Sequence, residues 1–262
     1  MPSPSEARQH PAEPARNGGG DPAAAVRARG IARRYGEGES AVQALRAVDL
    51  DVQAKALTAV MGPSGSGKST LMHVLAGLDR PTEGTVEVMG EQITTMGDKQ
   101  LTELRRSHVG FVFQFFNLVP VLSAEENIVL PLQLAGTHPA DGWVDELIDR
   151  VGLSDRRTHR PSELSGGQQQ RAAIARALVG RPSIVFADEP TGNLDSTSSA
   201  EIMTLMRGTT DELGQTTLMV THDPVAAATA DRVVFIADGT IAGDLRDPDE
   251  QAILAGMQEL SR

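Results

Sequence analysis

The stretch Gly62-Pro63-Ser64-Gly65-Ser66-Gly67-Lys68-Ser69-Thr70 decides how the rest of the chain is interpreted. It follows an apolar run at 57–61 and opens a helical pattern at 67–78, and a GxxxxGKS loop between a strand and a helix is typical of phosphate binding. Backbone N–H groups from Ser64 to Lys68 are expected to surround a β-phosphate. Lys68 would reach the β- and γ-phosphates, the Ser69 hydroxyl would bind Mg²⁺, and Thr70 would reach the α-phosphate.

A second glycine-rich turn, Leu164-Ser165-Gly166-Gly167-Gln168, lies about a hundred residues further along the chain and opens a helix at 169–178. A helix N-terminus attracts anionic phosphate oxygens, so this turn also suits a phosphate. One nucleotide cannot use both turns within one compact subunit. The pair of motifs therefore points to ATP held between two copies of the chain. The alternative is a helix start capped by Ser165, with no ligand.

Two carboxylates, Asp188 and Glu189, directly follow the apolar run 183–187. This pattern predicts a buried strand with both acids at its carboxyl end, where α/β sheets bind their ligands. Asp188 suits a water-mediated Mg²⁺ contact, and Glu189 suits a general base that orients the attacking water. The alternative is an exposed acidic pair at a strand end.

The rest of the chain alternates between strand and helix patterns and predicts an α/β fold with a mostly parallel sheet. Helical stretches between 123 and 152, the first capped by Ser123, predict a helical insert at about 115–165. We expect one domain over 27–250 and a short helix or tail at 251–262, without a C-terminal regulatory domain. Residues 1–26 are rich in proline, glycine and alanine, a composition that predicts a disordered tail. The further strands are expected at 26–35, 48–52, 57–61, 85–88, 108–113, 216–221 and 232–237, and a further helix at 197–213.

Composition limits the possible classes of function. The chain has 262 residues, a formal net charge of −11, no cysteine and 40% hydrophobic residues. The negative charge argues against nucleic-acid coating and against adsorption to anionic lipid by charge alone. No apolar run approaches the roughly 18 residues that a membrane span needs, and no secretory signal opens the sequence. We expect a cytoplasmic protein, held at a membrane only through a protein partner.

Six motifs in order resemble those of the nucleotide-binding subunit of ATP-binding-cassette (ABC) transporters, over about 28–243. They are Gly62 to Thr70, Gln114, Leu164 to Gln168, 184–189, Asn193-Leu194-Asp195 and His222. The resemblance implies a P-loop NTPase cassette. Its parts would be a RecA-like, mostly parallel core, an antiparallel β subdomain and an inserted α-helical subdomain.

The resemblance also implies how the two glycine turns cooperate. Two cassettes would pair head to tail, so that Ser165 and Gly167 of one copy close on the γ-phosphate held by Lys68 of the other. Gly166 and Gln168 complete that turn. Hydrolysis of Mg-ATP would then require a homodimer.

Four further residues receive roles from the resemblance, each beside a structural alternative. Gln114 would touch the Mg²⁺ and its water and sense the membrane partner, or it is an ordinary polar residue at a strand end. Asp195 would tie the two sites together and would also cap the helix near 196. His222 would grip the γ-phosphate beside Glu189, or it is a structural loop histidine. Tyr35 would stack on adenine, or it faces solvent at a strand end.

The segments 77–81, 111–120 and 188–196 resemble the ATPases of lipoprotein-release, macrolide-export and cell-division systems. We therefore expect an ATPase subunit, docked on separately encoded integral membrane permease subunits at the inner face of the plasma membrane. An apolar cluster after Gln114 would receive a permease helix, or it packs internally. The cluster consists of Phe115, Phe116, Leu118, Val119 and Val121.

Three other functions remain as alternatives to a transport ATPase. They are a mechanotransmission ATPase that moves no substrate, a P-loop small-molecule kinase, and a DNA-repair or translation cassette.

Overall fold

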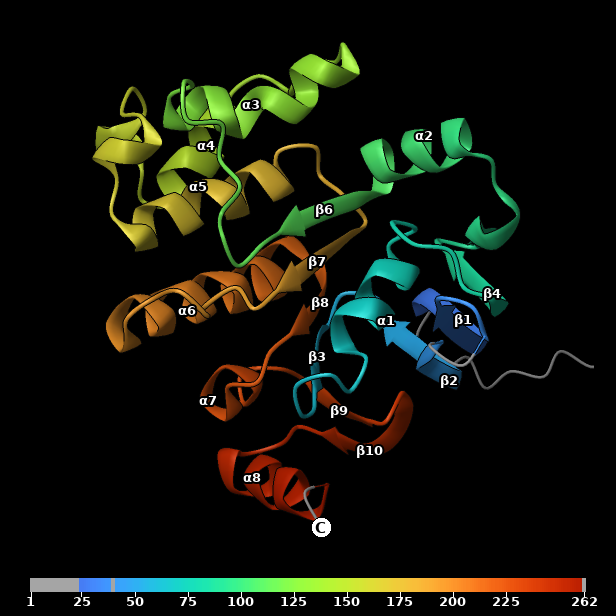
Figure 1. Cartoon of the computed structure of the whole chain (residues 1–262). Helices are drawn as coiled ribbons and strands as arrows, with labels where there is room; N and C mark the ends of the chain where they lie inside the picture. Colours follow the sequence, from blue (N-terminus) through green and yellow to red (C-terminus); the bar gives the residue numbers. More distant parts are fainter. Residues whose placement is uncertain (1–23, 39–40, 261–262) are drawn as a thin grey trace, which may run out of the picture.

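The computed structural model describes residues 24–38 and 41–260. Its main sheet has six strands in the order β10-β9-β3-β8-β7-β6 (Figure 1). The five strands from β9 to β6 run parallel, and β10 pairs antiparallel with β9. The strands are β3 (Leu57–Met61), β6 (Val109–Val112), β7 (Ile184–Asp188), β8 (Thr216–Val220), β9 (Arg232–Ala237) and β10 (Thr240–Arg246).

A second sheet, entirely antiparallel, lies beside the main one and has the order β2-β1-β4-β5. Together with the mostly parallel main sheet, it confirms the predicted α/β fold with an antiparallel β part. Its strands are β1 (Ala24–Tyr35), β2 (Val42–Gln53), β4 (Glu83–Val88) and β5 (Glu91–Gln92).

The main sheet is covered on both faces, which explains its uninterrupted apolar runs. Alternate residues of β3 point to opposite faces: Val60 joins the core formed with α1 and the second sheet, and Ala59 joins the core formed with the longer helices. Burying a large apolar side chain such as Phe186 of β7, which is fully buried, contributes about 1.5–3 kcal/mol. The helices are α1 (Lys68–Leu75), α2 (Asp98–His108), α3 (Ala124–Ala135), α4 (Trp143–Arg150), α5 (Gly166–Leu178), α6 (Ser196–Leu213), α7 (Pro224–Ala227) and α8 (Glu250–Glu259).

Helices α3, α4 and α5 gather at the β6 end of the main sheet, opposite α8 (Figure 1). Ser123 caps α3 as predicted, in a reciprocal pair of hydrogen bonds with Glu126. The fully buried Asn127 holds the preceding segment, because its side chain bonds the backbone of Val119, Leu122 and Ser123 at 2.7–3.2 Å. Short 3₁₀ turns at Ser154–Arg156 and Pro161–Glu163 lead back to α5.

Several predicted boundaries were wrong. Strand β1 begins at Ala24, so Ala24 and Ala25, expected in the tail, belong to the sheet, as does Val26, which is fully buried and was expected both to end the tail and to begin a strand. The helix expected at 67–78 ends at Leu75. Helix α2 was not predicted, and it takes in His108, which was expected to begin a strand. The remainder of the expected tail, 1–23, lies outside the described residues, as do 261–262.

Within the described ranges, 24–38 and 41–260, no helix combines the length and the apolar character that crossing a bilayer requires.

Candidate nucleotide site

The loop between β3 and α1 packs so closely that it has no room for side chains at two of its glycines. At Gly62, φ is +156°, and an added Cβ would lie 2.0 Å from the carbonyl oxygen of Ile236. At Gly67, φ is +106°, and the Cβ would lie 2.6 Å from the carbonyl oxygen of Ala44. Packing within the subunit therefore requires glycine at both positions, and the GxxxxGKS pattern of the loop is the one typical of phosphate binding.

Lys68 is the first residue of α1 and lies over the loop. Its ammonium group donates to the carbonyl oxygens of Gly62 and Pro63, both at 2.8 Å. Burial lowers the pKa of Lys68, although the nearby Glu189 and Asp188 act in the opposite direction. A cation at the N-terminus of a helix makes this end of α1 a suitable site for a phosphate anion.

Two of the three residues predicted to contact Mg²⁺, Ser69 and Asp188, lie next to each other. The Ser69 hydroxyl donates to Asp188 Oδ1 at 3.5 Å, across from the first turn of α1 to the end of β7. Burial raises the pKa of Asp188. The described residues contain no group of three His, Cys, Asp or Glu side chains that could hold a metal. One hydroxyl and one carboxylate fit a Mg²⁺ that takes its other ligands from phosphate and water.

Glu189 and His222 form a close pair beside this position. The His222 Nδ1 lies 2.9 Å from both carboxylate oxygens of Glu189. The Glu189 side chain is only 16% exposed, whereas that of His222 is 70% exposed. Glu189 adopts φ +46°, and its N–H donates to the Val220 carbonyl at 2.9 Å. A non-glycine residue in this conformation costs of order 1–3 kcal/mol, and such strain is concentrated at functional sites.

Gln114 follows β6 and lies against the loop that follows Glu189. An added Cβ at Gly192 would lie 2.9 Å from Gln114 Nε2, and the Asn193 amide donates to the Gln114 carbonyl at 2.8 Å. The sheet therefore brings together Lys68, Ser69, Asp188, Glu189, Gln114 and His222, although they are far apart in sequence. The spacing of the motifs did not indicate the role of Asn193 in this contact.

The second glycine turn begins α5 in another part of the subunit. Ser165 caps α5 through a reciprocal pair of bonds with Gln168. An added Cβ at Gly166 would lie 3.3 Å from Leu194, and one at Gly167 would lie 3.2 Å from Ser198 Oγ. This turn thus contacts the start of α6 in the same subunit, not the loop at Lys68.

Figure 1 shows the same separation, with α5 among the helices at the β6 end and α1 on the side of the second sheet. Asp195 caps α6, accepting hydrogen bonds from the Thr197 and Ser198 N–H groups at 3.0 Å and from the Ser198 hydroxyl at 2.8 Å. The hydrogen bonds from Ser198 lower the pKa of Asp195. A single subunit therefore already shows the predicted helix-capping role of Asp195.

Tyr35 ends β1 and is 40% exposed, but it has firm contacts. Its hydroxyl donates to Asp79 at 2.6 Å, and the guanidinium of Arg33 lies 4.4 Å from its ring centre. Neither partner was singled out in the sequence as a site residue. No local pattern could have shown the contact with Asp79, which lies 44 residues from Tyr35.

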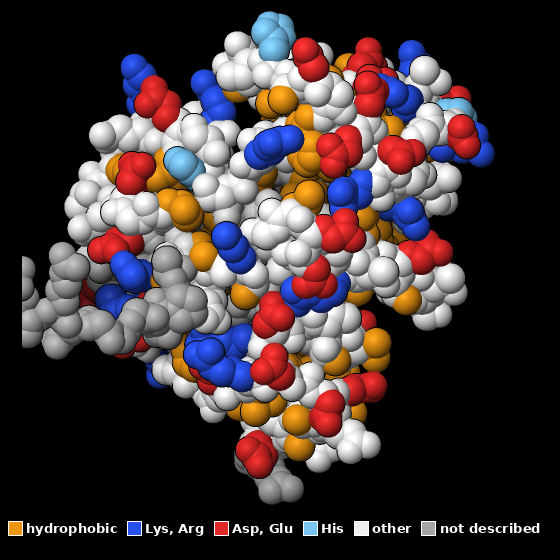
Figure 2. Space-filling model, turned by 180° about the vertical axis from the view of Figure 1, so that it is seen from behind, with side chains coloured by type: hydrophobic (Ala, Val, Ile, Leu, Met, Phe, Trp, Pro, Cys, Tyr) orange, Lys and Arg blue, Asp and Glu red, His pale blue; other side chains and the backbone are white. Residues whose placement is uncertain are grey.

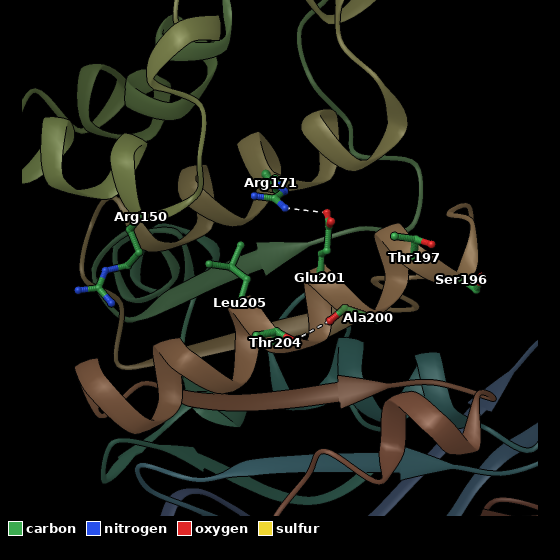
Figure 3. Close-up of a pocket in the computed structure, with 8 residues that line it drawn as sticks. All are labelled: Arg150, Arg171, Ser196, Thr197, Ala200, Glu201, Thr204 and Leu205. Carbon is green, nitrogen blue, oxygen red and sulfur yellow. Dashed lines mark hydrogen bonds and ion pairs between the residues drawn. The ribbon is translucent and has the colours of Figure 1, made fainter.

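Two hollows flank α6. The first, about 740 Å³, lies between α5 and α6, with Arg171 paired to Glu201 across it and Arg150 at one end (Figure 3). None of the predicted site residues lines it. The second, about 680 Å³, is lined by Glu189, His222 and Met203, among others. Only the second adjoins the predicted chemistry.

These features define a P-loop nucleotide-binding protein, with a glycine cradle, a lysine above it and a hydroxyl–carboxylate pair for Mg²⁺. A family model described as "ABC transporter" matches residues 45–192, which is more than half of the chain. The chain belongs to the ABC transporter family, and it is an ATPase cassette of that family.

Two curated relatives are similar to most of the chain. The macrolide export ATP-binding/permease protein MacB of Nitrosomonas europaea is 47% identical over 243 residues, which is 90% of this chain and 37% of the relative. The pyoverdine export ATP-binding/permease protein PvdT of Pseudomonas syringae pv. tomato is 48% identical over 222 residues, 82% of this chain and 33% of the relative. The chain thus spans about a third of the length of these relatives.

Two solved structures share the fold. The ATP-binding cassette MJ0796, in a dimeric post-hydrolysis state bound to ADP and Pi, aligns with a TM-score of 0.77 at 38% identity. This alignment covers 85% of this chain and 99% of MJ0796. CbiO1 of Clostridium perfringens, described as part of the ABC transporter complex cbiONQ, aligns with a TM-score of 0.78 at 27% identity. This second alignment covers 91% of this chain and 92% of CbiO1. The predicted cassette fold is confirmed.

Proposed function

We propose that two copies of this chain pair head to tail and hydrolyse Mg-ATP between them. The observation that carries the proposal is the separation of the Ser165 turn from the Lys68 loop, although both suit phosphate. A second copy would bring the Ser165 turn to the nucleotide held by the first. The dimeric state in which MJ0796 was solved supports the pairing of two copies.

Within that site, the chain's own residues would divide the work. Bound Mg-ATP supplies the phosphoryl group and the metal charge that neutralises it. Lys68 and the loop N–H groups would hold the phosphates, and Ser69, Asp188 and Gln114 would hold the metal. Glu189, fixed by His222, would orient the water and accept its proton.

We propose that the cassette drives an integral membrane permease and contacts the membrane only through it, on the cytoplasmic side. Phe115 and Val121 are 73% and 74% exposed, whereas Leu118 packs against the main core. The apolar cluster thus divides into an internal part and an exposed part. A hollow of about 290 Å³ near it is lined by Phe111 and Arg176, among others. Exposed aromatic and apolar side chains beside such a hollow suit an amphipathic helix of a partner.

Export is the favoured direction, because the relatives are named for macrolide and pyoverdine export. Those names join ATP-binding and permease parts in one protein, whereas we expect a separate permease for this chain. On the face shown in Figure 2, acidic and basic side chains are interspersed, which offers nucleic acid no continuous basic surface. A mechanotransmission ATPase that moves no cargo is the second candidate, favoured only by the resemblance of the segments 77–81, 111–120 and 188–196.

A complementation experiment tests the shared site. Lys68→Ala removes the phosphate lysine, and Ser165→Arg blocks the second turn, so each variant alone should be inactive. Mixed in equal amounts, they should recover roughly a quarter of the wild-type ATPase rate, because half of the pairs contain one intact composite site out of two. A mixture that stays inactive, although each variant still forms dimers, would contradict the head-to-tail site.

Glu189→Gln tests the assigned base. We expect ATP binding to persist and a stable dimer to accumulate with ATP, measured by size-exclusion chromatography. Glu259→Gln, at an exposed position of α8, is the control and should turn over normally. Normal turnover by Glu189→Gln would remove Glu189 from this role. Activity that needs a phosphoryl acceptor and does not rise steeply with protein concentration would favour the kinase alternative.

A further inference from the structure

Three side chains from two parts of the chain form a closed cluster at the end of β1. The Asp79 carboxylate accepts from the Tyr35 hydroxyl at 2.6 Å and from Arg33 Nε at 2.9 Å, both at Oδ2. Its other oxygen lies 2.8 Å from Arg33 Nη2. The guanidinium of Arg33 also lies 4.4 Å from the centre of the Tyr35 ring. Tyr35 is therefore held both at its hydroxyl and over its ring.

The cluster is attached to the phosphate loop by two routes. The Asp79 N–H donates to the His73 carbonyl in the last turn of α1, at 3.1 Å. The same helix begins at Lys68, and its eight residues span about 12 Å. On the other side, Arg33 pairs across the sheet with Leu45, whose Cδ2 lies 3.1 Å from the Cβ position of Gly67. The Tyr35 ring is thus fixed relative to the phosphate cradle.

We propose that Arg33 and Asp79 are positioning residues that hold Tyr35 as the platform for the nucleobase. The inference rests on the proposed function, in which Tyr35 stacks on adenine. Arg33 contacts the ring by a cation–π interaction, and Asp79 fixes its hydroxyl, so the ring has few rotamers to lose when a base arrives. The side chains of Arg33 and Asp79 are only 23% and 24% exposed, which limits screening of their ion pair by solvent.

The test compares a ligand that has a base with one that lacks it. ADP and inorganic pyrophosphate, each with Mg²⁺, displace a fluorescent ribose-labelled ADP from the purified chain. Arg33→Ala should raise the dissociation constant of ADP about fivefold, equivalent to roughly 1 kcal/mol. It should leave that of pyrophosphate unchanged, because the phosphate loop is intact. Equal weakening of both ligands would overturn the proposal, since it would indicate general damage to the fold.

A matched control exists on the same strand. Arg29 makes a bidentate pair with Asp51 at 2.6 and 2.8 Å, and among the described residues no aromatic ring lies under its guanidinium. Arg29→Ala should therefore leave the affinities for both ligands unchanged. If it weakens ADP as much as Arg33→Ala does, the effect belongs to β1 as a whole and the proposal fails.

Two further variants test whether Arg33 acts through Tyr35. Tyr35→Phe keeps the ring, removes only the hydroxyl and should weaken ADP by less than Arg33→Ala does. In a Tyr35→Ala background, Arg33→Ala should have no further effect on ADP. An undiminished effect in that background would mean that Arg33 contacts the nucleotide independently. If the wild-type chain binds ADP no more tightly than pyrophosphate, the base contributes no affinity, and the proposed stacking of Tyr35 on adenine is itself wrong.

Discussion

Replacing Gly67 with alanine tests the close contact between the phosphate loop and β2. The added Cβ would lie 2.6 Å from the Ala44 carbonyl oxygen and 3.1 Å from Leu45 Cδ2, at φ +106°. The backbone conformation alone costs a non-glycine residue about 1–2 kcal/mol. Because a backbone carbonyl cannot rotate away, the strand or the loop must also shift. We expect the free energy of unfolding to fall by about 2–4 kcal/mol.

Gly65→Ala is the matched control, since Gly65 also has a positive φ, +79°, but nothing lies within 4 Å of its added Cβ. It should cost only the conformational part, about 1–2 kcal/mol. Urea denaturation of both variants measures the difference, which reports the contacts of the added Cβ with Ala44 and Leu45 together with the larger φ of Gly67. Equal unfolding free energies for the two variants would refute the reasoning, because the contact would then contribute nothing.

Three other substitutions have defined outcomes. Asn127→Leu should lower the free energy of unfolding by about 2–4 kcal/mol in urea, because partly buried backbone groups of 119–123 lose their partners. Gln133→Leu, at an exposed position of the same helix, should have little effect. Equal costs for the two variants would contradict this reasoning. Burial raises the pKa of Asp188, so its ionised form is disfavoured in the folded state. Asp188→Asn should therefore stabilise the chain at pH 7, and the gain should shrink as the pH falls through that raised pKa and vanish below about 3.9. Asp244→Asn should instead destabilise the chain at pH 7, because the hydrogen bond from Arg232 lowers the pKa of Asp244 and so favours its ionised form in the folded state. This loss of stability should fade as the pH falls from the ordinary aspartate pKa through the lowered pKa. Unfolding curves at pH 7 and pH 3 measure both, and the same sign for the two variants would contradict the assignment.

The sequence predicted the parts of the fold that depend on short, local patterns. Strand β3 was placed at 57–61, as observed, because all five of its residues are apolar or small and buried. The phosphate loop could be placed for the same reason: its glycines, lysine and serine are adjacent in sequence. The caps at Ser123, Ser165 and Asp195 were also predicted, since a cap acts within three residues.

Features that depend on long-range contacts were missed. Helix α2 is strongly charged and buries only Leu101 and Leu104, so it has no wide apolar stripe to indicate a helix. Asn127 looks like any polar residue of a helix until the fold buries it. The partnership of Tyr35 with Asp79 joins two segments 44 residues apart, and no local pattern carries such a pairing.

The contact of Gly166 with Leu194 and of Gly167 with Ser198 has a genetic consequence if the copies pair as proposed. The segment 189–195 of a subunit would influence its own nucleotide through Glu189 and its neighbour's nucleotide through the glycine turn. A defect near Leu194 in one allele would then impair both reaction centres of a mixed pair. Such alleles are expected to be dominant over the wild type, whereas a lesion confined to Lys68 would spare one centre.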